Sequence, residues 1–215
     1  MTISQLKEII ISTSIQLMNE GILKNNGTLS ARLDHTIVIN PEGQNLSNIS
    51  PDDLVEVNIH TGIPKKGLLP AGEINRHLAV YKARPDLNAL IHSKTPSVIC
   101  CSKGARVVKP LLDDMAQIVG TSLKTAPPAL DGGSLKRLVK ALKKRNSVFL
   151  KGDGALCGAA TMDDAHAICQ VSEKACQAWV ESAVLGGGHV INGIESWLMR
   201  TVYLKKYSKQ AVSNK

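Results

Sequence analysis

The sequence has very few aromatic residues: one Phe, two Trp and three Tyr make up 3% of its 215 residues. Proteins that hold single-stranded nucleic acid stack its bases on aromatic side chains. The shortage therefore argues against a nucleic-acid partner, although the formal net charge is +8. Much of the positive charge falls on one face of a predicted helix, at Lys136, Arg137, Lys140, Lys143, Lys144 and Arg145. We interpret this as a solvated helix face, and a positive field would also suit a small anionic substrate.

Long apolar runs are also missing. None approaches the roughly 20 residues that a helix needs to cross a bilayer, so we expect no membrane partner. The N-terminal segment 1–5 lacks the basic residues and apolar stretch of a secretory signal. The five cysteines are an odd number without a Cys-x-x-Cys pair, which is typical of buried, reduced thiols. These observations predict a cytoplasmic protein.

The pattern of apolar residues predicts an α/β fold. Helices are expected at 4–20, 74–83, 96–102, from Asp163 or Asp164 to about Leu185, and at about 193–205. Strands are expected at 35–40, 55–59, 87–92 and 148–150, and Ser50 before Pro51 predicts a short helical turn. Because no repeat or linker divides the chain, we expect one domain over 1–215, with roughly the last 25 residues as a helical tail.

The strand at 87–92 ends in two residues that bear chemistry. Side chains alternate across a strand, so His92 and Lys94 point to the same face, roughly 6–7 Å apart. A second histidine in place of Lys94 would complete a chelating pair. A protonated lysine has hydrogen-bond donors but no lone pair for a metal. The pattern is therefore that of half a metal site.

Several segments, taken in order, resemble the class II aldolase/adducin family between about residues 4 and 185. They are Gly27–Arg32 (Gly-Asn-x-Ser-x-Arg in the family), Pro41–Gly43 (often Pro-Ser-Gly), Ile49–Val55, Pro70–His92, Gly152–Gly154 (Asn-His-Gly) and Gly158. The resemblance implies a three-layer α/β/α domain with a central, mostly antiparallel mixed sheet. It also implies a homo-tetramer whose pocket lies at the subunit interface.

Enzymes of this family cleave, epimerise or dehydrate sugar phosphates through an enediolate that zinc stabilises. Three histidines hold the zinc, and a glutamate is the acid/base. Matched to the family's motifs, Glu73 stands at the acid/base position and His92 at the first zinc ligand. Lys94 and Asp153 stand where the family has its second and third zinc histidines. The resemblance thus names Glu73 and Lys94 as candidate catalytic residues, and His92 and Asp153 as the remaining metal positions.

The resemblance also implies a phosphate pocket. Its substrate-binding candidates are Asn25, Gly27, Thr28, Gly43, Ala71 and Gly72. Where the enzymes carry two serines before the glutamate, this chain has Ala71 and Gly72, so two hydroxyl donors are missing. The backbone amides of Gly27 and Gly72 could still face an anion. A small anionic carbohydrate is the expected ligand.

Lys94 decides what we expect of the metal. Two cations ~4 Å apart repel by about 4 kcal/mol at an effective dielectric constant near 20, so zinc or another divalent ion would bind only if Lys94 were displaced. We therefore expect no cofactor, and an ion pair of the Lys94 ammonium with Glu73 and Asp153 in the metal's place. Glu73 is then either a proton shuttle or the partner of Lys94.

These expectations define two functions. The first is a class II aldolase-like protein of sugar-phosphate or hydroxy-carbonyl lyase ancestry, with its standard zinc chemistry lost or altered. The alternative is a non-enzymatic, adducin-like module for assembly or ligand binding.

Overall fold

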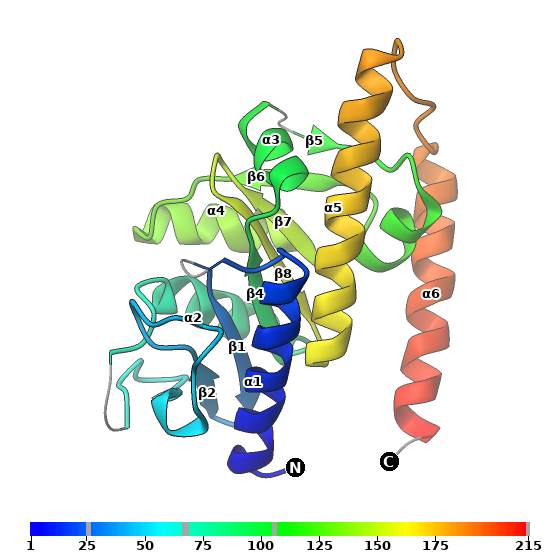
Figure 1. Cartoon of the computed structure of the whole chain (residues 1–215). Helices are drawn as coiled ribbons and strands as arrows, with labels where there is room; N and C mark the ends of the chain where they lie inside the picture. The colour runs from blue at the N-terminus through cyan, green and yellow to red at the C-terminus, as the bar shows by residue number, and fades with distance from the viewer. Residues whose placement is uncertain (25–26, 66–68, 105–106, 214–215) are drawn as a thin grey trace.

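The computed structural model describes residues 1–24, 27–65, 69–104 and 107–213, without the side chains after Lys206. Within these residues an eight-stranded sheet has the order β3-β2-β1-β4-β8-β7-β6-β5 (Figure 1). The strands are β1 (Leu29–Leu33), β2 (Thr36–Ile39), β3 (Val55–Asn58), β4 (Ala89–Ser93), β5 (Val107–Val108), β6 (Leu123–Ala126), β7 (Ser147–Leu150) and β8 (Gly154–Ala159). Neighbours pair antiparallel, except that β6 and β7 are parallel.

Helices cover both faces of this sheet. They are α1 (Ile3–Asn19), α2 (Ile74–Ala83), α3 (Pro96–Gly104), α4 (Gly132–Leu142), α5 (Met162–Val184) and α6 (Gly193–Ser213), together with the 3-10 turn η1 (Pro51–Asp53) and the π-helical turn η2 (Met115–Val119). Apolar residues of α1, α3 and α5 share one core, and those of α2 and α4 share the other. Figure 1 shows the sheet between these two sets of helices, and α6 beside η2. The three-layer, mostly antiparallel arrangement is confirmed.

Strand β4 shows how the alternation of side chains places the site. Ala89 and Ile91 belong to the core beneath α1 and α5, whereas Leu90 belongs to the core with α2 and α4. His92 follows Leu90 by two residues and therefore faces α2. Because α2 begins just after Glu73, the end of β4 and the start of α2 meet on this face.

The predicted elements agree with the structure except at some ends, and four strands, β1, β5, β6 and β8, were not predicted. The helix at 74–83 is confirmed as α2. The long helix α5 is capped by Thr161, whose hydroxyl accepts from the Asp164 N–H, so capping by Asp163 or Asp164 was wrong. Strand β8 was not predicted, because its small residues carry no β-branched pattern, although it is buried throughout.

Gly154 is required where β8 begins beside β4. Its φ is +102°, and a Cβ at this position would lie 2.2 Å from the Ser93 carbonyl oxygen. Only glycine fits such a close approach of two backbones. The turn that ends at Gly154 therefore brings Asp153 directly against His92.

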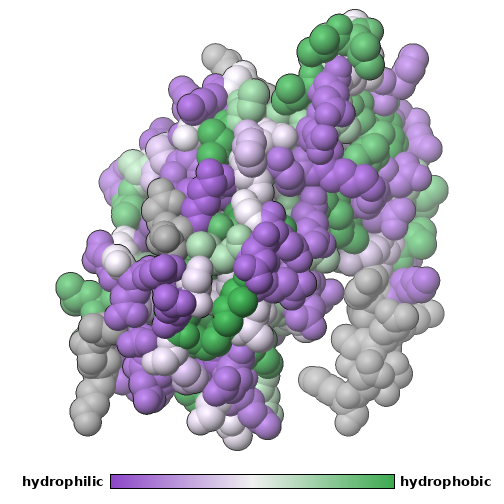
Figure 2. All heavy atoms as spheres, in the orientation of Figure 1, coloured by the Kyte–Doolittle hydropathy of each residue, from purple (hydrophilic) through white to green (hydrophobic). Residues whose placement is uncertain are grey.

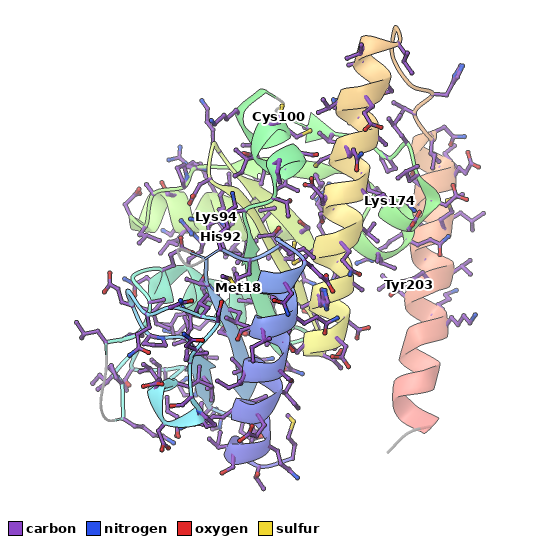
Figure 3. The ribbon with its side chains drawn as sticks, viewed as in Figure 1. Met18, His92, Lys94, Cys100, Lys174 and Tyr203 are labelled. Carbon is purple, nitrogen blue, oxygen red and sulfur yellow. The ribbon has the colours of Figure 1, made fainter. Side chains whose placement is uncertain are left out.

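The five cysteines are free thiols, four buried and one, Cys100, exposed on α3 (Figure 3). The expectation of buried thiols was thus wrong for Cys100, which faces away from the core. Among the described residues no helix combines the length and the apolar character that a membrane crossing needs.

Candidate functional site

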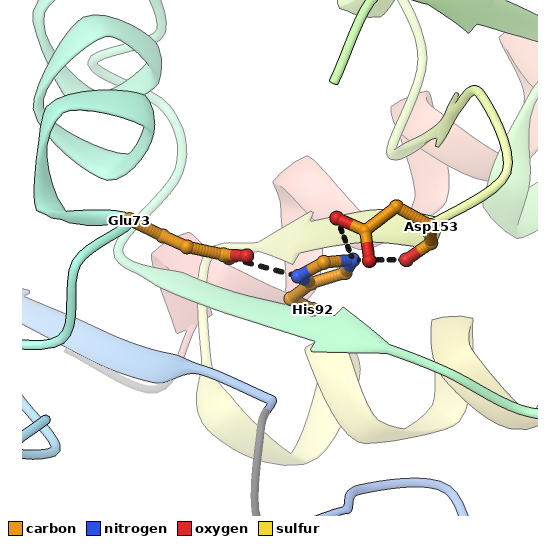
Figure 4. Close-up of side chains that lie close together, drawn as sticks. All are labelled: Glu73, His92 and Asp153. Atoms are coloured by element: carbon orange, nitrogen blue, oxygen red, sulfur yellow. Dashed lines mark hydrogen bonds and ion pairs between the residues drawn. The ribbon is translucent and has the colours of Figure 1, made fainter. Parts of the chain in front are cut away.

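Four side chains from three parts of the fold meet on the α2 face of the sheet. Glu73 caps α2, His92 ends β4, Lys94 follows it, and Asp153 lies in the turn between β7 and β8 (Figures 3 and 4). Lys94 Nζ lies 3.0 Å from Asp153 Oδ1. His92 Nδ1 lies 2.8 Å from Glu73 Oε2, and His92 Nε2 lies 2.6 Å from the Asp153 backbone oxygen. The resemblance thus brought together residues that are neighbours in space.

The Glu73 carboxylate is held on one oxygen by two hydrogen-bonding partners and one ion pair. Besides His92, the Thr28 hydroxyl donates to Oε2 at 3.0 Å, and Arg76 Nη1 lies 2.8 Å away. Burial by itself raises the pKa of Glu73, but the hydrogen bond and charge of His92 and the charge of Arg76 outweigh it. The pKa of Glu73 therefore lies well below its usual value, and the carboxylate is ionised at neutral pH. An ionised group with a low pKa is a weak base.

The expected ion pair between Lys94 and Glu73 was wrong. Arg76, one turn further along α2, is the cation that pairs with Glu73. Its side chain is only 3% exposed, and its other guanidinium nitrogen donates to the Pro128 carbonyl. A spacing of three residues on a helix places the two side chains together, and that spacing was the sequence signal for the pair.

The imidazole of His92 is fully buried between two acceptors. The Asp153 carbonyl oxygen can only accept, so Nε2 carries a hydrogen. Nδ1 faces the ionised carboxylate of Glu73, which also accepts. Both ring nitrogens therefore face acceptors, and a metal would have to displace one of them.

Ligand atoms of Glu73, His92 and Asp153 lie within 4.8 Å of one another, so these residues could hold a metal ion. The set consists of two carboxylates and one imidazole. It differs from three histidines in charge and in its preference for harder, oxygen-binding metals. The Lys94 ammonium occupies one side of this group, at Asp153 Oδ1.

Thr28 and His77 extend the site into the core. The Thr28 hydroxyl lies 2.8 Å from His77 Nε2, and His77 Nδ1 lies 2.7 Å from the Ser30 hydroxyl. All three residues are buried. Burial lowers the pKa of His77 from 6.5 to about 3, so the ring is neutral. Sequence analysis named Thr28 as a substrate contact and did not see this network.

His77 should make stability depend on pH. Its pKa is lower in the folded chain, so unfolding takes up a proton and stability is lost as pH falls from 6.5 towards 3. Between pH 7 and pH 5 we expect His77 to reduce the free energy of unfolding by about 2 kcal/mol. In urea titrations the free energy of unfolding of His77→Gln should depend less on pH than that of the wild type. The exposed control His60→Gln should keep the wild-type dependence. If the free energy of unfolding changed equally with pH in wild type and His77→Gln, the prediction would be contradicted.

The other substrate-binding candidates fall in three separate segments of the chain. The Gly27 N–H already donates to the Lys24 carbonyl at 2.7 Å, and the Ala71 N–H donates to Asn40. Gly43 is exposed in a turn with φ +72°. Asn25 lies outside the described residues. Substrate contacts at these positions stay a prediction.

Gly72 has an acidic neighbour. A Cβ built on Gly72 would lie 3.2 Å from Glu42 Oε1, so this carboxylate reaches the segment that the resemblance assigns to phosphate. Glu42 stands in the Pro41–Gly43 turn, where the family often has serine. A carboxylate here repels a phosphate dianion.

Comparison with known proteins supports the resemblance. Residues 8–180 match the family described as Class II Aldolase and Adducin N-terminal domain. The chain is 28% identical over 207 residues to a 5-methylthioribulose-1-phosphate/5-deoxyribulose-1-phosphate aldolase of Escherichia coli O45:K1, covering 94% of this chain and 95% of that protein. It is 24% identical over 179 residues to the L-fuculose phosphate aldolase of Escherichia coli K12, covering 82% and 83%.

Solved structures show the same fold. An L-fuculose 1-phosphate aldolase superposes with a TM-score of 0.87 at 23% identity, covering 93% of this chain and 96% of that chain. The L-fuculose-1-phosphate aldolase of Thermus thermophilus superposes with a TM-score of 0.74 at 19% identity, covering 86% and 98%. The chain therefore belongs to the class II aldolase and adducin family.

Proposed function

We propose that this chain is a carbon–carbon lyase for a small hydroxy-carbonyl compound of the sugar-phosphate class, and that it works without the three-histidine zinc. The observation that carries the proposal is the Lys94–Asp153 ion pair, 3.0 Å long, beside His92. It supports a fixed positive charge beside the imidazole that the resemblance assigns to the metal. The names of the aldolase relatives support the reaction class, and the donor set of the site supports the absence of zinc.

The residues present do not fit the family's zinc. Only His92 remains of the three imidazoles, and both of its nitrogens face acceptors. The carboxylate of Asp153 is already neutralised by Lys94. A divalent ion would have to displace the ammonium and one hydrogen bond of the ring, at a cost of several kcal/mol.

Lys94 and Glu73 can divide a retro-aldol cleavage between them. A proton leaves the substrate hydroxyl, the adjacent carbon–carbon bond breaks, and its electron pair moves onto the carbonyl oxygen as an enolate. The Lys94 ammonium can donate to that oxygen, and the enol carbon then takes up a proton. Glu73 is the candidate proton carrier. Its lowered pKa makes it a weak base, so we expect slow turnover.

Metal content and activity together test this function. We expect purified protein to carry far less than one zinc per chain and to cleave members of a hydroxy-carbonyl panel, offered with and without phosphate, at a rate that EDTA does not change. Lys94→Met should lower kcat about 100-fold or more, because it removes the group facing the enolate oxygen. The control Lys103→Met, an exposed lysine on α3, should not.

Two results would contradict the proposal. One zinc per chain, with activity lost on its removal, would restore the family chemistry. Ligand binding by calorimetry without turnover of any panel member would favour the non-enzymatic module instead.

We also propose that the chain associates with copies of itself. Large apolar side chains lie exposed at the end of α5 and on α6, namely Val184, Leu185, Ile194, Trp197, Leu198, Val202 and Leu204. Figure 2 shows hydrophobic residues gathered at the top of the view, around the end of α5. Large apolar side chains exposed in such numbers are typical of protein interfaces. We propose a homo-tetramer as the particular assembly. A cytoplasmic location is a separate proposal.

Light scattering after size-exclusion chromatography measures the association. We expect a mass near four chains for wild type and a smaller mass for Trp197→Lys, because Trp197 is 61% exposed on this surface and a buried lysine would oppose docking. Lys206→Ala serves as a control on the same helix. A wild-type monomer at micromolar concentration would contradict the proposal.

A further inference from the structure

A chain of buried polar side chains connects Glu73 to Tyr81. Thr28 and Ser30 are two residues apart at the start of β1 and face α2, while His77 and Tyr81 are four apart and share a face of α2. The links are Thr28 Oγ1 to Glu73 Oε2 at 3.0 Å, Thr28 Oγ1 to His77 Nε2 at 2.8 Å, His77 Nδ1 to Ser30 Oγ at 2.7 Å, and Ser30 Oγ to the Tyr81 hydroxyl at 2.9 Å. None of the four side chains beyond Glu73 is more than 3% exposed.

The hydrogen-bond inventory of these groups fixes the direction of each link. The ionised carboxylate of Glu73 can only accept, so it takes the single hydroxyl hydrogen of Thr28. The contact between Thr28 and His77 must then be a bond in which His77 Nε2–H donates to the Thr28 oxygen. His77 is neutral and has one N–H, so its Nδ1 carries a lone pair.

The same reasoning continues to the far end. Nδ1 of His77 accepts the hydroxyl hydrogen of Ser30. Because that hydrogen is used, the Tyr81 hydroxyl is the donor to Ser30, either to its side-chain oxygen or to its carbonyl oxygen, each 2.9 Å away. From Ser30 onward every hydrogen therefore points towards Glu73, and the Tyr81 hydroxyl holds the Ser30 end of the path.

We propose that Tyr81, Ser30, His77 and Thr28 are positioning residues that hold Oε2 of Glu73, so that Oε1 is the oxygen that meets the ligand and carries the proton. Among the described residues, every contact that the structure gives the Glu73 carboxylate is made by Oε2. A fully hydrogen-bonded buried network rigidifies the side chains that it joins. Its order from Ser30 to Glu73 thereby fixes one carboxylate. The catalytic part of this inference rests on the proposed lyase function.

The tautomer of His77 tests the direction without any activity measurement. Long-range nitrogen–hydrogen NMR spectra of the wild-type protein at neutral pH should show His77 as a single neutral tautomer with its hydrogen on Nε2. The opposite tautomer would reverse the chain and turn the Thr28 hydroxyl away from Glu73. That result, or a charged ring, would overturn the proposal.

Kinetics test the positioning role. Thr28→Val, which keeps the shape and removes the hydroxyl, should lower kcat at least 10-fold with little change in KM, and Thr28→Ser should restore most of it. Tyr81→Phe should lower kcat several-fold. The control Ser172→Ala changes a serine that is equally buried but lies in the other core, on α5, and should leave kcat unchanged.

A higher KM with unchanged kcat in Thr28→Val would make Thr28 a substrate contact and overturn the positioning role. A wild-type protein without turnover would refute the lyase proposal alone, because the NMR spectra still decide whether the chain runs from Ser30 to Glu73.

Discussion

Replacing both Lys94 and Asp153 with histidine should give a protein that binds about one zinc ion per chain, where the wild type binds almost none. The double change removes the ammonium and supplies two imidazoles beside His92. His92 Nε2 must then leave the Asp153 backbone oxygen, which costs about 1 kcal/mol. The free energy of zinc binding to three histidines exceeds this cost, since structural zinc sites contribute about 10 kcal/mol or more. Metal analysis after dialysis against zinc-free buffer measures the result.

The single variants are the matched controls. Asp153→His leaves the Lys94 ammonium in place without its partner, and Lys94→His leaves the Asp153 side chain free, so neither should approach the affinity of the double variant. An intermediate affinity in Lys94→His is compatible with one imidazole gained. A double variant that folds and still retains no zinc would show that positions 94 and 153 do not correspond to the family's metal ligands.

Glu73→Gln should destabilise the fold by about 3–5 kcal/mol, because it leaves the guanidinium of Arg76 buried without its counter-charge. For a chain of this size that is a fall in Tm of about 6–20 °C. The amide keeps an oxygen for the Thr28 hydroxyl but presents no charge to Arg76. Calorimetry of the two proteins at pH 7 measures the difference.

The same variant has a defined pH dependence. The pKa of Glu73 is lower in the folded chain than the usual 4.5, so its stabilising contribution is complete above pH 4.5 and is lost as pH falls further. The gap in Tm between wild type and Glu73→Gln should therefore narrow below pH 4.5. The control is Glu56→Gln, whose ion pairs with Lys7 and Lys65 are more exposed and should contribute less than about 1 kcal/mol. Equal losses in the two variants would mean that Arg76 does not depend on Glu73.

Much of the layered fold could be predicted from apolar periodicity. The helix that follows Glu73 and the strand that ends in His92 both have strong patterns, so both elements could be foreseen, and the resemblance predicted that they meet. Strand β8 could not, because Gly154–Ala159 is built of small residues that are buried on both faces and show no period. Its place beside β4 follows from a close backbone approach at Gly154, which is a tertiary feature.

The residues of the candidate site could be predicted, but the hydrogen bonds and ion pairs between them could not. Matching short motifs to the family named Glu73, His92, Lys94 and Asp153, and the structure brings these four together. The partners of Glu73 were missed: Arg76 has a helical spacing that any surface pair could have, and Thr28 is 45 residues away in sequence. Such pairings depend on how the sheet and α2 pack, so a single sequence does not specify them.

The bond between His92 and residue 153 is made by the peptide group, not by the side chain. The strength of this hydrogen bond therefore does not depend on which side chain stands at position 153. When a metal-binding residue at 153 is exchanged for an acidic one and the metal is lost, the neighbouring imidazole can make this bond at once. A position of that kind allows a catalytic centre to change its chemistry without passing through an unfolded intermediate form.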